Sequence, residues 1–175
     1  MAKHTKSDLM TALIRIKAVK INSRQLFTWS SGIRSPIYID NRIIGSFVIT
    51  RRQIYDALAS LVKKHFPHAQ AILGVVTGGM IPANFVAQQL KLPLGYVRSI
   101  TKTHGRKRGV EGFIPADTRV VLVEDTIATG RTFSQAYEQA RQSGLTVLGG
   151  ACIFNYNLLR SCALLNKKLM IKLPS

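Results

Sequence analysis

The chain has 175 residues, 46% of them hydrophobic, which is enough for one substantial core and too little for several domains. Its 25 lysines and arginines against 8 acidic residues give a formal net charge of +17, which favours polyanionic ligands. The sequence has neither a bilayer-spanning apolar run nor a signal peptide, so we expect no membrane partner. Cys152 and Cys162 lack zinc-site or CxxC spacing, which predicts reduced thiols and a cytoplasmic location.

Helix-like and strand-like segments alternate along the chain. One-sided apolar patterns predict a helix over residues 7–20, capped by Ser7, and a helix over residues 50–65, capped by Thr50. Continuous apolar runs predict strands over residues 71–76, 94–98, 120–123 and 147–154. The order of these segments predicts an α/β fold with a mostly parallel, Rossmann-like sheet flanked by helices.

Three connecting segments carry further signals. Residues 27–42 (FTWSSGIRSPIYIDNR) contain turn residues and the only tryptophan, Trp29, which we expect in the core. Gly78 and Gly79 follow the strand 71–76, where they permit either a tight turn or close approach of a ligand. Residues 99–112 are polar, basic and interrupted by glycine, which predicts a surface loop that is either simply solvated or functional.

The segment 120–132 (VVLVEDTIATGRT) is the most informative in the chain. A predicted strand is followed by the acidic pair Glu124 and Asp125, a turn rich in Thr and Gly, and an apolar helix face over residues 133–140. Many α/β proteins bind phosphate where a strand leads through a turn of small residues into a helix, because the first N–H groups of the helix are free to contact it. Two carboxylates repel a phosphate but accept hydrogen bonds from vicinal hydroxyls, so the pattern indicates a ribose 5-phosphate. The alternative is that both acids only cap the helix.

Four segments in matching order resemble motifs of the orotate phosphoribosyltransferases, which are type I phosphoribosyltransferases, and of their shorter bacterial subgroup in particular. Residues 120–132 resemble the loop that binds phosphoribosyl diphosphate (PRPP), and residues 74–79 lie where the family has its pyrophosphate turn. Residues 27–42 resemble the N-terminal motif and residues 96–112 the catalytic loop, and these two segments indicate orotate. The resemblance implies a single domain with the type I fold: a small N-terminal hood (1–45), an α/β core (46–156) and an atypical basic tail (157–175).

The resemblance also implies an activity and its residues. Orotate would displace pyrophosphate from C1 of PRPP to give orotidine 5′-monophosphate, a step of pyrimidine biosynthesis. The implied catalytic residues are Lys102, His104 and Asp125. PRPP would contact Arg98, Lys102, His104, Glu124, Asp125, Thr126, Ile127, Ala128, Thr129, Gly130, Arg131 and Thr132, pyrophosphate would contact Thr77, Gly78 and Gly79, and orotate would contact the Ala128 backbone.

A cofactor and a partner follow from the same resemblance. We expect Mg²⁺ held mainly through PRPP, with no metal ligands supplied by the protein, because the protein offers too few carboxylates for a cage of its own. The catalytic loop would close over the neighbouring subunit's site, which implies a homodimer with shared active sites.

Three departures from the family pattern leave alternatives open. Ser99 replaces a usual lysine, and Ala128 replaces a Ser or Thr that contacts the base in many members. Residues 158–175 are short and basic, which predicts that the last strand is either absent or replaced, with an exposed sheet edge that a partner subunit could cover. A PRPP-sensing regulator that binds nucleic acid therefore stays an alternative, although no aromatic residues interleave the basic runs; a phosphoribosyltransferase for another base is the second.

Overall fold

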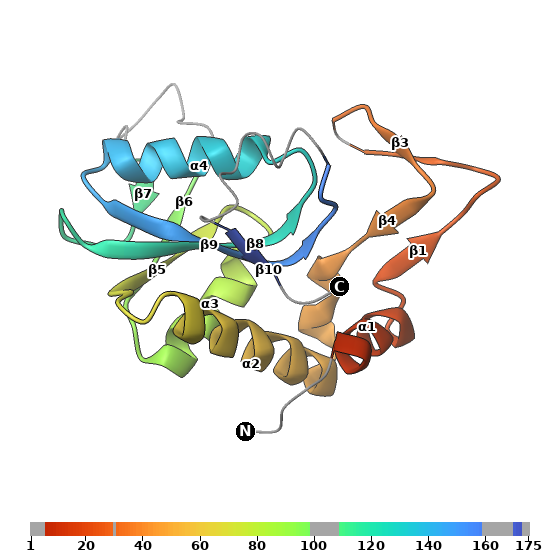
Figure 1. Ribbon diagram of the computed structural model, residues 1–175, viewed down its shortest axis with the longest axis horizontal. Coiled ribbons are helices and arrows are strands. Elements are labelled where there is room, and N and C mark those ends of the chain that lie inside the picture. The colour runs from red at the N-terminus through yellow and green to blue at the C-terminus, as the bar shows by residue number, and fades with distance from the viewer. Residues whose placement is uncertain (1–5, 30, 99–108, 159–169, 173–175) are drawn as a thin grey trace.

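The computed structural model describes residues 6–29, 31–98, 109–158 and 170–172, and these form an α/β sandwich (Figure 1). Its six-stranded sheet has the order β10-β9-β8-β5-β6-β7. The parallel strands are β5 (Ala71–Val75), β6 (Leu94–Val97), β8 (Arg119–Ile127), β9 (Thr146–Asn155) and β10 (Met170–Lys172), and β7 (Val110–Glu111) pairs antiparallel with β6. The predicted mostly parallel sheet is confirmed.

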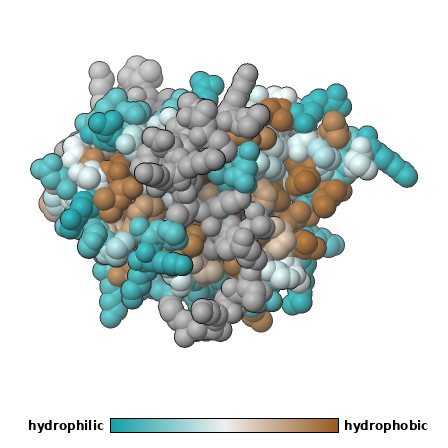
Figure 2. Space-filling model, viewed as in Figure 1, coloured by the Kyte–Doolittle hydropathy of each residue, from teal (hydrophilic) through white to brown (hydrophobic). Residues whose placement is uncertain are grey.

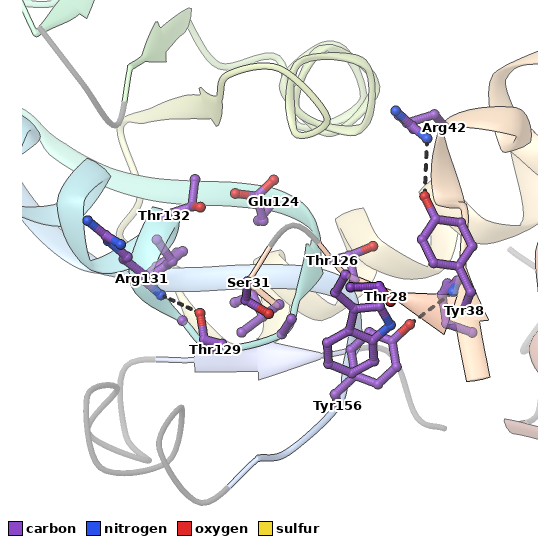
Figure 3. A pocket seen from close by; sticks show the side chains of 16 residues that line it. Thr28, Ser31, Tyr38, Arg42, Glu124, Thr126, Thr129, Arg131, Thr132 and Tyr156 are labelled. Atoms are coloured by element: carbon purple, nitrogen blue, oxygen red, sulfur yellow. Dashed lines mark hydrogen bonds between the residues drawn. The ribbon is translucent and has the colours of Figure 1, made fainter. Parts of the chain in front are cut away.

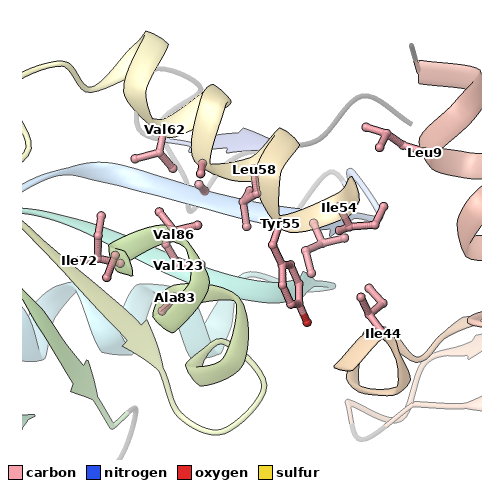
Figure 4. Packing of buried hydrophobic residues seen from close by; sticks show 14 of the residues in the cluster. Leu9, Ile44, Ile54, Tyr55, Leu58, Val62, Ile72, Ala83, Val86 and Val123 are labelled. Atoms are coloured by element: carbon pink, nitrogen blue, oxygen red, sulfur yellow. The ribbon is translucent and has the colours of Figure 1, made fainter. Parts of the chain in front are cut away.

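Helices cover both faces of this sheet. Helices α2 (Val48–His65) and α3 (Met80–Leu90) lie on one face and α4 (Arg131–Gln142) on the other (Figure 1). Alternate residues of β8 serve the two cores: Val121 and Val123 pack towards α2 and α3, whereas Val120 and Leu122 pack towards α4. Figure 4 shows Val123 among the side chains of the first core. A strand buried on both faces requires an uninterrupted apolar run, which is why the sequence pattern identified it.

The N-terminal part forms a small appendage beside the sheet, which we call the hood and define as strands β1 to β4. Strand β1 (Val19–Ile21) pairs antiparallel with β4 (Ile37–Ile39), and β2 (Phe27–Thr28) pairs antiparallel with β3 (Arg34–Ser35). Helix α1 (Lys6–Arg15) precedes the hood, and the 3₁₀ helix η1 (Asn41–Ser46) joins it to α2. Apolar side chains gather on the hood side of the molecule in Figure 2.

Both predicted helix starts were wrong in detail. Helix α1 begins at Lys6, so Ser7 lies inside its first turn, and the helix ends at Arg15 because Lys17 adopts a left-handed φ of 61° before β1. Helix α2 follows Phe47, which makes no side-chain capping bond, and Thr50 is buried within the helix. None of the described helices is both long enough and apolar enough to cross a membrane.

Of the two outcomes predicted for the last strand, absence and replacement, the structure shows a short strand in its place. Strand β10 adds to the sheet beyond β9, with Met170 opposite Gly150 and Lys172 opposite Cys152. The short C-terminal segment therefore covers part of the edge of β9 that the sequence had suggested would be bare.

Candidate active site

A cavity of about 440 Å³ opens between the carboxyl end of β8 and the hood. This is the edge at which parallel α/β sheets place their ligands. Figure 3 shows its two sides: the start of α4 with Thr129, Arg131 and Thr132, and, opposite, Tyr38 of the hood and Arg42 of η1. The lining residues are Thr28, Trp29, Ser31, Tyr38, Ile39, Arg42, Glu124, Thr126, Ile127, Ala128, Thr129, Gly130, Arg131, Thr132, Phe133 and Tyr156.

The first side of the cavity is a turn that can hold an anion. Strand β8 continues to Ile127, four residues beyond the predicted strand, because β9 pairs with it as far as Asn155. The chain then turns through Gly130, whose φ of 79° favours glycine, and α4 begins at Arg131. The first N–H groups of a helix lack partners within the helix, and its dipole favours negative charge there. The strand, glycine turn and helix start that the sequence predicted are therefore present.

The acidic pair makes no ion pair within the described residues, whose three ion pairs join Arg42 to Asp40, Arg52 to Asp56 and Arg98 to Glu111. Glu124 lines the cavity and is 5% exposed, and its Oε1 accepts the N–H of Asp125 at 3.2 Å. Burial, and secondly the negative charge of Asp125, raise the pKa of the Glu124 carboxyl well above its ordinary value. A buried carboxyl without a cation, next to an open cavity, is suited to hydroxyl groups of a ligand rather than to a structural salt bridge.

The two carboxylates have different surroundings. Asp125 is half-buried and is absent from the cavity lining; its Oδ1 accepts the N–H of Thr126 at 2.8 Å. Its carboxylate lies against the turn 77–79, so closely that a Cβ on Gly78 would fall 2.5 Å from Asp125 Oδ2. A Cβ on Gly79 would collide with the carbonyl oxygen of Val123. Gly79 is thus required by the backbone packed against it, whereas at Gly78 the neighbour is the Asp125 side chain, which therefore lies at the predicted pyrophosphate turn.

The second side of the cavity is aromatic, and the sequence alone did not predict it. The Trp29 and Tyr156 rings lie 4.2 Å apart between centroids, so Trp29, expected in the core, instead forms part of the cavity wall. The Tyr156 hydroxyl accepts the N–H of Ile39 at 2.9 Å and thereby ties the end of β9 to the hood. Tyr156 lies two residues beyond the predicted strand 147–154, and that position at the ligand edge was the available signal.

One cation from η1, next to the hood, faces the same cavity. The Arg42 guanidinium donates to both carboxylate oxygens of Asp40, at 2.8 and 3.2 Å, and to the Tyr38 hydroxyl at 3.4 Å. The hydrogen bond from Arg42 lowers the pKa of Asp40. Asp40 therefore fixes the position of Arg42 and offsets part of its charge.

Of the remaining predicted residues, Arg98 and Thr77 lie apart from the cavity lining. Arg98 follows β6, is half-buried, and its Nε lies 4.0 Å from Glu111 Oε1. Thr77 is exposed at the turn beside Asp125. Lys102 and His104 fall outside the described residues.

Comparisons with known proteins agree with this geometry. Residues 49–165 match the phosphoribosyl transferase domain. The chain is 43% identical over 151 residues to the orotate phosphoribosyltransferase of Staphylococcus aureus strain Mu50, covering 86% of this chain and 74% of that protein. It is 44% identical over 151 residues to the enzyme of that name from Enterococcus faecalis, covering 86% of this chain and 72% of that protein. The crystal structure of orotate phosphoribosyltransferase from Aeropyrum pernix superposes with a TM-score of 0.80 at 29% identity, covering 94% of this chain and 92% of that chain.

Proposed function

The chain belongs to the orotate phosphoribosyltransferase family, and on that basis we propose that its cavity transfers the phosphoribosyl group of PRPP to orotate. The products are orotidine 5′-monophosphate and pyrophosphate, and the step belongs to pyrimidine biosynthesis. The observation that carries this function is the meeting, in one cavity, of a phosphate-binding helix start, a carboxyl without a cation and an aromatic hood.

Different residues around the cavity bind different parts of the substrates. The turn 128–130 and the start of α4 hold the 5′-phosphate through N–H groups and the hydroxyls of Thr129 and Thr132. Glu124 accepts a ribose hydroxyl, and Asp125, at the turn 77–79, holds the side of the ribose that faces the diphosphate. The base lies between Trp29, Tyr38 and Tyr156, where a flat ring fits against aromatic faces.

The chemistry explains why opposite charges lie so close together. Breaking the bond between C1 and the pyrophosphate oxygen leaves positive charge on the ribose ring and negative charge on the departing group. The carboxylates stabilise the cationic ring, and Arg98, with Lys102 and His104, neutralises the pyrophosphate. Lys102 or His104 supplies a proton to the leaving group, while orotate N1 loses its proton as it bonds to C1.

We propose Mg²⁺ as the cofactor, bound mainly through substrate oxygens. The described residues contain no group of three or more His, Cys, Asp or Glu side chains that could hold a metal ion by themselves. Asp125 is the carboxylate at the pyrophosphate turn and would contact the ion or its water molecules. When bound, Mg²⁺ neutralises charge on the diphosphate.

We also propose a homodimer and a cytoplasmic location. An exposed apolar patch supports the dimer: it comprises Phe47, Val48 and Ile49 at the start of α2 and Met80 and Ile81 at the start of α3, which are 37–77% exposed. The two helix starts are adjacent, since a Cβ on Gly45 would lie 3.8 Å from Ile81 Cδ1. Burial of such a patch favours association.

The proposed cytoplasmic location is supported by the proposed substrates, PRPP and orotate, because both are charged metabolites.

An absorbance assay tests the function. We expect orotate absorbance to fall when PRPP and Mg²⁺ are added to the protein, and to stay constant with Lys102→Ala. Lys63→Ala, at an exposed lysine in the last turn of α2, is the matched control and should keep full activity.

The net charge of +17 favours a second candidate, a PRPP-sensing regulator that binds nucleic acid. Absence of orotate turnover, together with salt-sensitive binding of RNA or DNA, would establish that candidate instead. Turnover with adenine or another base in place of orotate would instead indicate a phosphoribosyltransferase of different specificity.

A further inference from the structure

Asn41 contacts the end of β8, at Asp125 and Thr126, and does not line the cavity. It is the first residue of η1, directly after the hood, and only 2% of its surface is exposed. Its Nδ2 donates to the backbone carbonyl oxygen of Asp125 at 2.9 Å and to Thr126 Oγ1 at 3.0 Å. Asn41 is absent from the cavity lining, whereas Thr126 lines it. The Asn41 amide thus contacts the Thr126 hydroxyl from outside the cavity, and a ligand in the cavity would contact the same hydroxyl from within.

The sheet explains why a side chain is needed at this point. Strand β5 pairs with β8 only as far as Val123, and the chain then turns away through residues 77–79. The carbonyl of Asp125 therefore lies beyond the last β5 residue and obtains its donor from Asn41. A buried carbonyl left without a donor would destabilise the strand end that carries both carboxylates.

The Asn41 amide is oriented with its nitrogen, and not its oxygen, towards Asp125 and Thr126. Within the described residues, Asn41 Oδ1 is the one buried side-chain oxygen or nitrogen with no hydrogen-bond partner. Rotating the amide would place that oxygen against the carbonyl oxygen of Asp125, so that two acceptors would face each other. An unpartnered buried acceptor costs free energy, which the two donated bonds must offset.

We propose that Asn41 is a positioning residue that makes the Thr126 hydroxyl a donor to the anionic substrate, an inference that rests on the proposed binding of PRPP in this cavity. A hydroxyl has one hydrogen and two lone pairs. The Asn41 N–H occupies one lone pair of Thr126 Oγ1, so the hydroxyl hydrogen points elsewhere, and the open direction is the cavity. Phosphate and diphosphate oxygens are acceptors, and they require a donor there.

Asn41→Asp is the sharpest test, because it keeps the shape of the side chain and removes both donors. The new carboxylate accepts the Thr126 hydrogen and so draws it away from the ligand. We expect the Kd for PRPP, measured by calorimetry without orotate, and the KM for PRPP to rise about tenfold or more, which corresponds to about 1.4 kcal/mol. If Asn41 were merely structural, fewer molecules of the variant would fold. The fraction of protein that binds PRPP in the titration, and kcat, would then fall, while the Kd for PRPP would stay unchanged.

Three further variants complete the test. Asn22→Asp is the matched control: Asn22 Oδ1 accepts the N–H groups of Arg24 and Gln25, which a carboxylate also accepts, so PRPP binding should stay the same. Asn41→Ser, whose shorter side chain cannot reach both acceptors, should also weaken PRPP binding. In a Thr126→Val background, Asn41→Asp should raise the Kd for PRPP by a clearly smaller factor than in the parent, because only the contact with the Asp125 carbonyl remains to be lost.

The outcomes separate this inference from the proposed function. A parent protein that binds no PRPP refutes the proposed function, and with it the premise used here. A parent that binds PRPP, with a folded Asn41→Asp that binds it equally well, refutes the role of Asn41 alone. The role is also refuted by the same loss with and without the Thr126 hydroxyl, or by failure of both Asn41 variants to fold, which would make Asn41 purely structural.

Discussion

Substituting alanine for Gly78 and, in a second variant, for Gly79 should separate an effect on PRPP binding from an effect on folding stability. A Cβ on Gly78 would overlap the carboxyl carbon and both carboxylate oxygens of Asp125, and this side chain can turn away by rotating about its Cα–Cβ bond. A Cβ on Gly79 would collide with the Val123 carbonyl and lie 2.8 Å from Val75 N, and this backbone is fixed in the sheet. The same substitution therefore displaces a carboxylate in one case and strains the core sheet in the other.

The magnitudes follow from these contacts. Gly78→Ala moves Asp125 away from the ribose and removes a charge-assisted hydrogen bond worth about 1.5–3 kcal/mol, so PRPP binding should weaken roughly 10- to 150-fold. The free energy of unfolding should change by less than about 1 kcal/mol, because a surface turn can relax. Gly79→Ala should lower the free energy of unfolding by about 1–3 kcal/mol or more, as overpacking does, and the Tm by about 2–4 °C for each kcal/mol.

Calorimetric titration with PRPP and thermal unfolding measure the two effects independently. Gly45→Ala is the control, since its Cβ would make only an ordinary contact of 3.8 Å with Ile81, and both properties should stay unchanged. Normal PRPP affinity in a folded Gly78→Ala protein would show that the position of Asp125 is irrelevant to the ribose. Equal destabilisation by both alanines would refute the distinction between a side chain that yields and a backbone that does not.

Further predictions concern the carboxylates and the hood. Asp125→Asn should weaken PRPP binding or turnover about tenfold or more, and unchanged kinetics would remove Asp125 from the ribose site. Because burial and the Asp125 charge raise the pKa of Glu124, the folded state keeps a proton that the unfolded chain releases, and stability falls as the pH rises above the ordinary glutamate value. Glu124→Gln should therefore raise the Tm at pH 7 while weakening PRPP binding; a lower Tm would contradict the cost of burying this charge. Tyr156→Phe leaves the Ile39 N–H without its partner and should raise the KM for orotate more than that for PRPP, as steady-state kinetics would show.

The sequence by itself determined the parts of the site whose contacts are local. The strand, the turn at Gly130 and the apolar face of α4 involve residues within one short segment, so their pattern predicted the local structure on which the proposed phosphate site depends. The continuous apolar runs likewise identified the parallel strands, since burial on both faces leaves no polar alternation. The order of four short motifs was enough to indicate the family.

Only the tertiary structure decided what completes the site, because those contacts join distant residues. The hood meets the core through Ile39 and Tyr156, which are 117 residues apart, and Asn41 meets Asp125 across 84 residues. No local pattern encodes such pairs: they exist because parallel strands end at one edge of the sheet, where segments from across the chain converge. The same packing places Glu124 at the cavity and Asp125 at the turn beside Gly78. The sequence shows only that these two acidic residues are adjacent, so it could not predict this difference.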